Sequence, residues 1–438
     1  MILSLSDRKP AAARNHLRPV VGLAVVLLGL ATTGLQAQLP TVGTVVAGSA
    51  TITTAPNTMT VTAGNNSVLR WGSFDVGTGQ TVQFVQPGSD ARVLNWIGGL
   101  TPSQIDGSLL ANGQVYLLNP AGVYIGQSAV IDVGRLYAIG GSMAKEDFLS
   151  GIDRFTGLTG DVRNAGSIRG DFIALVGRSV ANSGSIVSPG GFIGLASGDQ
   201  VLLGRNGSSI YVDTGRSASA DAALRAGTGV ANTGTIDAGR GSTVLAAGDL
   251  YSIAISHDGK LVARDVRLQG QGRGDVLVSG TIDASATAPG ETGGRVEITG
   301  EHVGLLNTAN INASGDAGGG TVLVGGDYQG KNPDVRNATA TYFGPGASVN
   351  ADALNSGNGG KVIVWSDNAT RAYGTLSARG GEQGGNGGLV ETSGHWLDVA
   401  GVHVDTSASL GTRGTWLLDP YNVTIAAGAI GASTFGAG

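Results

Sequence analysis

The sequence lacks cysteine altogether in a chain of 438 residues. This absence excludes disulfide bonds, thiolate metal ligands and a cysteine nucleophile. Charged residues are also scarce, at 13% of the chain against a usual share of about 25%. The formal net charge of −5 gives no basic surface for nucleic acid. We therefore expect neither a disulfide-stapled fold nor a nucleic-acid partner.

Long hydrophobic runs are missing too. An apolar run at residues 20–30 is too short to span a bilayer as a helix, and no later stretch reaches about 18 apolar residues. The run follows a basic segment, as in a secretory signal peptide, that contains Arg8, Lys9, Arg14 and Arg18. We expect residues 1–37 to be a signal peptide cleaved between Ala37 and Gln38, and we expect no membrane anchor.

Glycine, in contrast, is abundant. It supplies 76 of the 438 residues, more than twice its usual share of about 7%. Apolar residues make up 41% of the chain, which is enough for a core. Gly and Pro together stay below the roughly 25–30% that indicates disorder. This composition fits many short strands joined by tight turns.

A pattern Asn-x-Gly-x-Ile recurs at residues 164–168, 182–186 and 232–236. Drifted forms follow at 281–284, 310–313 and 348–351, beside Gly-led alternating segments at 294–298, 320–324 and 360–364. Such self-similarity is typical of a solenoid, in which stacked repeats bury a continuous core. We therefore predict an all-β fold, a right-handed parallel β-helix.

The repeat has a physical logic. We expect Asn and Gly at the corners to adopt left-handed conformations, and Asn side chains of successive rungs to hydrogen-bond along the stack. At roughly 20–28 residues per rung, the predicted mature chain gives about 14–20 rungs. Residues 41–85 are β-rich, and the open end of a stack of strands needs a cap because it exposes unpaired backbone groups. Residues 142–149 and 218–226 indicate short helices outside the strand stack.

A tight corner is expected at Asn119-Pro120-Ala121-Gly122, between two apolar strands. Asn at the first position, Pro at the second and Gly at the fourth are typical of a type I turn. Val123 begins the second strand. As one hydrogen-bonding group, the Asn119 side chain would contribute about 0.5–1.5 kcal/mol.

The same stretch, NPAGVYIG, resembles the Asn-Pro-Asn-Gly-Ile motif in the secretion domain of two-partner secretion exoproteins, the filamentous haemagglutinin family. Neighbouring blocks follow the family's order, at residues 92–95, 102–107, 112–115, 131–134 and 147–151. Residues 415–420 are similar to a later block of long exoproteins. Two positions differ from the family motif, because Ala121 replaces its second Asn and Val123 replaces its Ile. The likeness covers residues from about Gln38 to about Leu203.

The resemblance implies export through the periplasm and recognition by an outer-membrane transporter, with residues 119–123 as the secretion motif. Residues 38–270 would be the secretion domain, with residues 41–85 capping the start of the solenoid, and 271–438 the start of a truncated passenger. The expected role is adhesion by a fibre at the bacterial surface or secreted from it, with host-cell receptors or glycans as targets. Alternatives are the delivery part of a haemolysin or contact-dependent toxin, and a haem-scavenging exoprotein.

Other candidate functional sites have little support in the sequence. His395 and His403 lie near Glu391 and Asp398 in the sequence, but a solvated rung edge explains them better than a metal site. Two triplets of the integrin-binding type occur, and the repeat explains both, since each Gly-Asp opens a strand: Arg169-Gly170-Asp171 and Arg273-Gly274-Asp275. No grouping of nucleophile, base and oxyanion donors is apparent. We therefore predict no enzyme activity, no cofactor and no bound metal.

Overall fold

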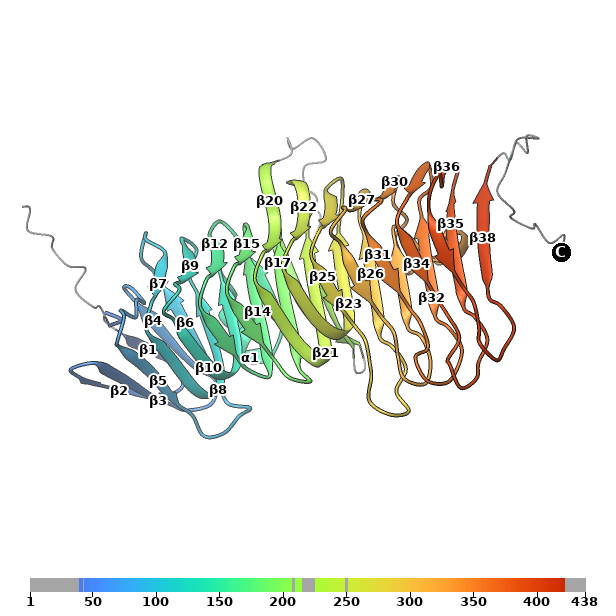
Figure 1. Cartoon of the computed structure of the whole chain (residues 1–438). Coiled ribbons are helices and arrows are strands. Elements are labelled where there is room, and N and C mark those ends of the chain that lie inside the picture. Colours follow the sequence, from blue (N-terminus) through green and yellow to red (C-terminus); the bar gives the residue numbers. More distant parts are fainter. Residues whose placement is uncertain (1–38, 42, 207–208, 215–224, 249–250, 422–438) are drawn as a thin grey trace, which may run out of the picture. The chain divides into compact units, whose positions relative to one another are not determined.

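The short strands stack rung upon rung into a right-handed parallel β-helix, as predicted (Figure 1). The computed structural model describes residues 39–41, 43–206, 209–214, 225–248 and 251–421. Each rung contributes a strand to each of three ladders, in which every strand pairs in parallel with its counterpart in the next rung. Apolar side chains alternate toward the interior along these strands, so stacking buries a continuous core.

The first ladder contains the Ile of the repeat. It runs through β3 (Thr58–Ala63), β5 (Thr81–Val85), the first halves of β8 (Ser108–Leu118) and β10 (Val130–Ile139), β13 (Ser167–Arg169), β16 (Ser185–Val187), the first halves of β21 (Thr235–Ala247) and β23 (Lys260–Gly270), β25 (Thr281–Asp283), β28 (Asn310–Asn312), β31 (Ser348–Asn350), β34 (Thr375–Ser377) and β37 (His403–Asp405).

The second ladder carries the longest buried strands. It runs through β4 (Ser67–Trp71), β6 (Arg92–Ile97), the second halves of β8 and β10, β14 (Phe172–Gly177), β17 (Phe192–Ser197), the second halves of β21 and β23, β26 (Arg295–Thr299), β29 (Thr321–Val324), β32 (Lys361–Trp365), β35 (Leu389–Gly394) and β38 (Thr415–Pro420).

The third ladder closes each rung. It consists of β7 (Ser103–Ile105), β9 (Gly122–Ile125), β12 (Asp161–Asn164), β15 (Val180–Asn182), β20 (Arg225–Asn232), β22 (Tyr251–His257), β24 (Asp275–Val278), β27 (His302–Leu305), β30 (Ala340–Phe343), β33 (Ala369–Ala372) and β36 (Trp396–Asp398).

The predicted number of rungs is too high. In the described residues, the apolar column of the first ladder from Val82 to Val404 has 12 stacked members. The reason is that insertions lengthen some rungs. Asn164 and Asn182 are neighbours at a separation of 18 residues, whereas Asn182 and Asn232 are neighbours at a separation of 50. The solenoid tolerates such insertions because each rung contacts only its neighbours.

A cap at the start of the solenoid is present, but it is smaller than the expected residues 41–85, because β3, β4 and β5 already belong to the ladders. Strand β1 (Thr44–Ala47) pairs antiparallel with β4, and β2 (Ala50–Ala55) forms an antiparallel hairpin with β3. These two strands lie at the beginning of the stack (Figure 1), where they cover strand edges that would otherwise be unpaired.

A strap outside the strand stack comprises residues 144–156, with helix α1 (Lys145–Ser150) and strand β11 (Asp153–Thr156). The helix begins later than predicted, since the Ser142 amide pairs with Thr156 and the N-cap residue is Ala144. Strand β11 pairs with β18 (Gln200–Asn206), and β18 pairs with β19 (Ser209–Asp213). Of the second predicted helix, residues 218–224 lie outside the described residues, and Arg225 and Ala226 belong to strand β20.

These elements cover a second core on the outer face of the second ladder. Phe148 of the strap and Phe155 of β11 are both buried there, together with Tyr116, Tyr137 and Phe172. A further short insertion contains the 3₁₀ turn η1 (Tyr328–Gly330) and buries Val335 against β29 and β32. Strands of the second ladder therefore have apolar residues on both faces, which hides their alternating pattern.

The predicted asparagine ladder exists, and a histidine extends it. The side-chain amide of Asn164 donates to Asn182 at 2.8 Å, and that of Asn182 donates to Asn232 at 2.7 Å. Asn232 then donates to Nδ1 of His257 at 3.1 Å, and His257 Nε2 donates to the Thr281 carbonyl at 3.1 Å. Burial lowers the pKa of His257, which keeps the neutral ring that this arrangement requires.

The glycines of the repeat act differently from the prediction. Gly184, Gly234 and Gly259 do not have positive φ, and neither do the ladder asparagines. A Cβ on each of these glycines would instead collide with the backbone carbonyl oxygen of the equivalent glycine one rung earlier. Glycine is therefore required by the close approach of stacked backbones, and the expectation of left-handed corners is wrong at these positions.

Candidate functional site

The corner between β8 and β9 has the geometry expected for residues 119–122. The Gly122 amide donates to the Asn119 carbonyl at 2.9 Å, and the Ala121 amide donates to the Asn119 side-chain oxygen at 2.9 Å. The Asn119 side-chain amide donates to the Thr101 carbonyl at 3.0 Å and to the Ser103 hydroxyl at 3.1 Å. The predicted tight turn between two buried strands is confirmed.

Asn119 is an internal residue of this corner. Its exposed fraction is 0%, and its side chain is hydrogen-bonded to the turn, to Thr101 and to Ser103 at the start of β7. Its neighbour Pro120 is exposed and Ala121 is half-buried. Gly122 has a φ of +125°, and a Cβ there would lie 2.8 Å from the Asp161 carbonyl oxygen. Asn119 and Gly122 therefore fix the position in which Pro120 and Ala121 are presented.

One exposed leucine and a groove lie near the turn. Leu100 is 98% exposed and lies next to Thr101, and the carbonyl oxygen of Thr101 accepts a hydrogen bond from the Asn119 side chain. A groove of about 270 Å³ borders Pro120 and is also lined by Arg70 and Trp96. We call Leu100, Pro120, Ala121 and this groove the corner surface. Leu100 and Pro120 are thus both presented to solvent at this corner.

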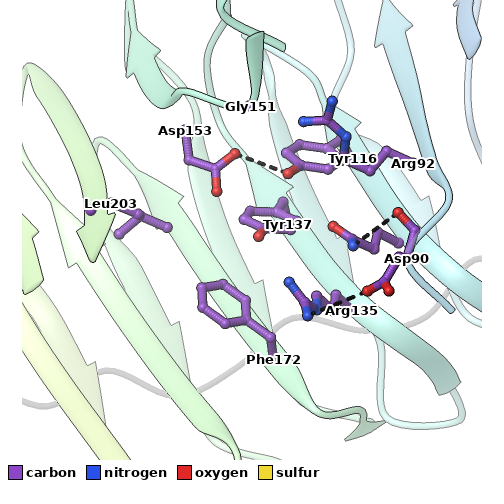
Figure 2. Close-up of a pocket in the computed structure, with 11 residues that line it drawn as sticks. Asp90, Arg92, Tyr116, Arg135, Tyr137, Gly151, Asp153, Phe172 and Leu203 are labelled. Atoms are coloured by element: carbon purple, nitrogen blue, oxygen red, sulfur yellow. Dashed lines mark hydrogen bonds and ion pairs between the residues drawn. The ribbon is translucent and has the colours of Figure 1, made fainter. Parts of the chain in front are cut away.

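A second pocket lies between the outer face of the second ladder and the strap, with a volume of about 260 Å³ (Figure 2). Tyr116 and Tyr137 stack in it with ring centroids 3.9 Å apart, and Phe148 meets Tyr116 edge-on at 5.2 Å. The Tyr116 hydroxyl donates to Asp153 at 2.9 Å. Arg92 lies over the Phe148 ring at 5.0 Å. These contacts hold the strap against the solenoid.

The electrostatics of this pocket follow from its burial. Burial raises the pKa of the Tyr116 and Tyr137 hydroxyls, and the nearby Asp153 carboxylate raises both further. Burial also raises the pKa of Asp153, although the two hydroxyls and the guanidinium of Arg92 oppose this shift. The tyrosines therefore stay protonated and act as hydrogen-bond donors, which is a structural role.

The profile of the TPS secretion domain, where TPS stands for two-partner secretion, matches residues 31–298. The chain belongs to this family. Among solved structures, the HMW1 secretion domain from Haemophilus influenzae is similar to it, with 27% identity and a TM-score of 0.70 over 87% of this chain and 100% of that chain. The family resemblance drawn from the turn and its neighbouring blocks is confirmed.

Two curated relatives of the TPS domain, both from Haemophilus influenzae, carry the name heme/hemopexin-binding protein. One is 35% identical over 195 residues, or 42% of this chain, and the other is 44% identical over 86 residues, or 19% of this chain. The matched regions span 22% and 9% of the length of these relatives. The TPS domain therefore corresponds to a minor part of each of them.

The structure places the two Arg-Gly-Asp triplets of the TPS chain at corners of the solenoid. Gly170 lies between β13 and β14, and a Cβ on it would meet the Val133 carbonyl at 2.6 Å. A Cβ on Gly274 would lie 2.5 Å from the Cβ of Ala254, and Asp275 is bonded to His302. Both glycines are thus needed for packing, and integrin binding stays an untested prediction.

The other predicted sites are scattered or lie outside the described residues. Ala37 and Gln38 are outside them, and so is the rest of the predicted signal peptide. His395 stacks on Tyr421 at 4.7 Å, and His403 is on β37. The described residues contain no cluster of His, Cys, Asp and Glu that could hold a metal ion. Within the same residues, no helix has the length and apolarity needed to cross a membrane.

Sequence reasoning missed three features of the TPS domain. Leu100 gave no signal beyond being apolar in a Gly-rich segment. Asp153 lies outside the quoted blocks, and its contact with Tyr116 depends on the path of the strap. His257 could have been found, because residues 257–261 keep the x-Gly-x-apolar frame of the repeat with His in the place of Asn.

Proposed function

We propose that an outer-membrane transporter recognises this TPS domain at the corner surface during two-partner secretion. The observation that carries the proposal is the buried, fully bonded Asn119, which fixes the exposed Pro120 beside a leucine that is 98% exposed. An apolar side chain held in water on an ordered corner has an energetic reason to be covered by a partner. The transporter would bind the corner surface directly, and Asn119 would act by holding the residues of that surface in position.

Secretion into the medium, with the partner transporter co-expressed, tests the proposal. Leu100→Ser should reduce export several-fold while urea unfolding is unchanged, because the side chain is almost wholly solvated in the folded chain. Leu410→Ser is the matched control, since Leu410 is 73% exposed on a loop far along the chain. Equal export of the two variants would reject the corner surface as the recognition site.

Asn119→Ala should lower both export and stability. One hydrogen bond, which is all that the sequence predicts, gives a loss of about 0.5–1.5 kcal/mol, whereas the side chain makes three. Three bonds at about 1 kcal/mol each give about 3 kcal/mol. An export defect with no change in unfolding would show that Asn119 is contacted directly, against its burial.

Several finer statements belong to the same proposal. The signal peptide would be removed between Ala37 and Gln38, which N-terminal mass spectrometry of the secreted protein tests. Residues 38–270 would form the secretion unit and 271–438 the first passenger repeats. Adhesion as a surface fibre, with host receptors or glycans as targets, is one role for the whole protein.

A second candidate role is haem acquisition, which the names of the two curated relatives favour. In that role the exported protein would bind haem or hemopexin outside the cell. Binding of hemin and of hemopexin by the secreted protein, measured separately, distinguishes this role from adhesion to host cells. Binding of neither would remove it.

A further inference from the structure

A pair of arginines lies beside the corner surface, along the third ladder. Gly122, which ends the turn, is the register partner of Asp161 on β12, and Tyr124 is the register partner of Arg163 on the same strand. Asp161 is buried, whereas the side chains of Arg163 and Arg178 are 61% and 51% exposed. Two cations therefore surround one carboxylate on the strand next to the corner.

Arg178 by itself satisfies this carboxylate. Its Nε donates to one Asp161 oxygen at 3.1 Å and its Nη2 donates to the other at 3.2 Å, which is the bidentate geometry of a strong pair. Burial would raise the pKa of Asp161, but hydrogen bonds from Ser179 and Arg178 and the charges of both arginines hold the pKa below its ordinary value. Asp161 is thus an anion that already has its counterion, and the charge of Arg163 is in excess.

Arg163 is held in an outward position with donors to spare. Its guanidinium lies over the Tyr124 ring at 5.3 Å, and its Nη2 donates to Asp161 at 3.2 Å. Its Nε and Nη1 have no hydrogen-bond partner among the described residues. Its register neighbours, Tyr124 and Ala181, are uncharged. A stacked guanidinium loses little further freedom when it pairs with a carboxylate, and Tyr and Arg are enriched among the residues that dominate interfaces.

The corner surface and Arg163 are parts of one packed unit. The Thr159 hydroxyl donates to the Pro120 carbonyl at 2.8 Å, and β12 begins two residues later. A Cβ on Gly160 would collide with the backbone nitrogen of Gly122, so the two backbones are in close contact. A standard protein interface buries about 800 Å² on each partner. A partner of that size that covers Pro120 therefore also reaches Arg163 on the neighbouring strands.

We propose that Arg163 pairs with a carboxylate of the transporter when the transporter covers the corner surface. The inference rests on the proposed function and names the chemistry of its partner, which is an acidic side chain beside an apolar contact for Leu100 and Pro120. The guanidinium offers parallel N–H donors that match the two oxygens of a carboxylate. Because the cation lies in solvent, its main effect is on the association rate and on the salt dependence of binding. Arg178 takes no direct part, since it is committed to Asp161.

Binding of the purified chain to the partner transporter in a non-ionic detergent, measured at several salt concentrations, tests this pair. Wild-type binding should weaken as the salt concentration rises, because salt screens exposed charges. Arg163→Gln should weaken binding several-fold at low salt and reduce its dependence on salt, and Arg163→Glu should weaken binding further. Arg371→Gln is the matched control, because Arg371 lies far along the same ladder on β33, where its guanidinium lies over the Trp396 ring at 5.3 Å. This control should bind as the wild type does.

Folding and export separate this inference from the proposed function. Urea unfolding of Arg163→Gln should match the wild type, because Asp161 keeps its bidentate partner. If Leu100→Ser reduces export and Arg163→Gln does not, the corner surface stands and the arginine contact is rejected. If only Arg163→Gln reduces export, the arginine contact stands and the corner surface is rejected. Equal binding by Arg163→Gln and Arg371→Gln, or a salt dependence of Arg163→Gln equal to that of the wild type, would overturn the proposal.

Discussion

Replacing Asn182 by alanine should open the β-helix locally at one corner. Asn182 is the middle member of the asparagine ladder, and its exposed fraction is 1%. It accepts from Asn164 at 2.8 Å and donates to Asn232 at 2.7 Å. The alanine variant removes both bonds and leaves polar atoms of two buried neighbours without these partners, in a place that water does not reach.

The expected cost follows from these contacts. Two lost side-chain bonds contribute about 0.5–1.5 kcal/mol each, and an unsatisfied buried group costs about 1–3 kcal/mol. Because these terms overlap, we expect a total destabilisation of about 2–5 kcal/mol. In a solenoid the effect should be concentrated in the adjacent rungs, since each rung contacts only its neighbours.

Hydrogen exchange resolved along the chain measures this effect. Amides of β12, β15 and β20 should exchange faster in Asn182→Ala, while those of β31 to β35 keep their protection. Ser183→Ala is the control, because Ser183 is the exposed next residue of the same corner and the bond that its side chain makes is a long one, 3.3 Å to the Asn164 carbonyl. Equal protection in the two variants would refute the claim that the ladder stabilises the corner.

Three other predictions concern the ladder, its glycines and the strap. Burial holds the pKa of His257 below its ordinary value of 6.5. Because the unfolded chain therefore binds this proton at a higher pH than the folded chain, the free energy of unfolding should fall as the pH drops below about 6.5. Urea unfolding at several pH values should show a smaller fall for His257→Asn. Gly234→Ala should cost about 1–3 kcal/mol through overpacking, whereas Gly88→Ala, where a Cβ meets nothing within 4 Å, should leave the unfolding midpoint nearly unchanged. Phe148→Ala should cost about 3–5 kcal/mol locally and expose the strap to limited proteolysis; a strap that resists cleavage as in the wild type would contradict its anchoring by Phe148.

The sequence by itself determined the fold class and the location of the turn. The apolar residue of Asn-x-Gly-x-Ile marks the first ladder, because the spacing within the motif stays the same even where insertions lengthen the rungs between motifs. Asn119 and Gly122 were recognisable because turn chemistry is local and depends on residues within four positions of each other. The asparagine ladder could be expected for another reason, since Asn164, Asn182 and Asn232 occupy the same position of the repeat.

Only the tertiary structure decided which residues from distant rungs meet. Asp275 and His302 are separated by 27 residues, and insertions of variable length set that register. The role of Gly234 was misassigned because its constraint comes from the backbone of Gly184 one rung earlier. The burial of Asn119 beside an exposed Leu100 likewise depends on how a separate loop packs. Side-chain type and local turns are encoded over a few residues, whereas contacts between rungs are fixed by parallel pairing across whole repeats.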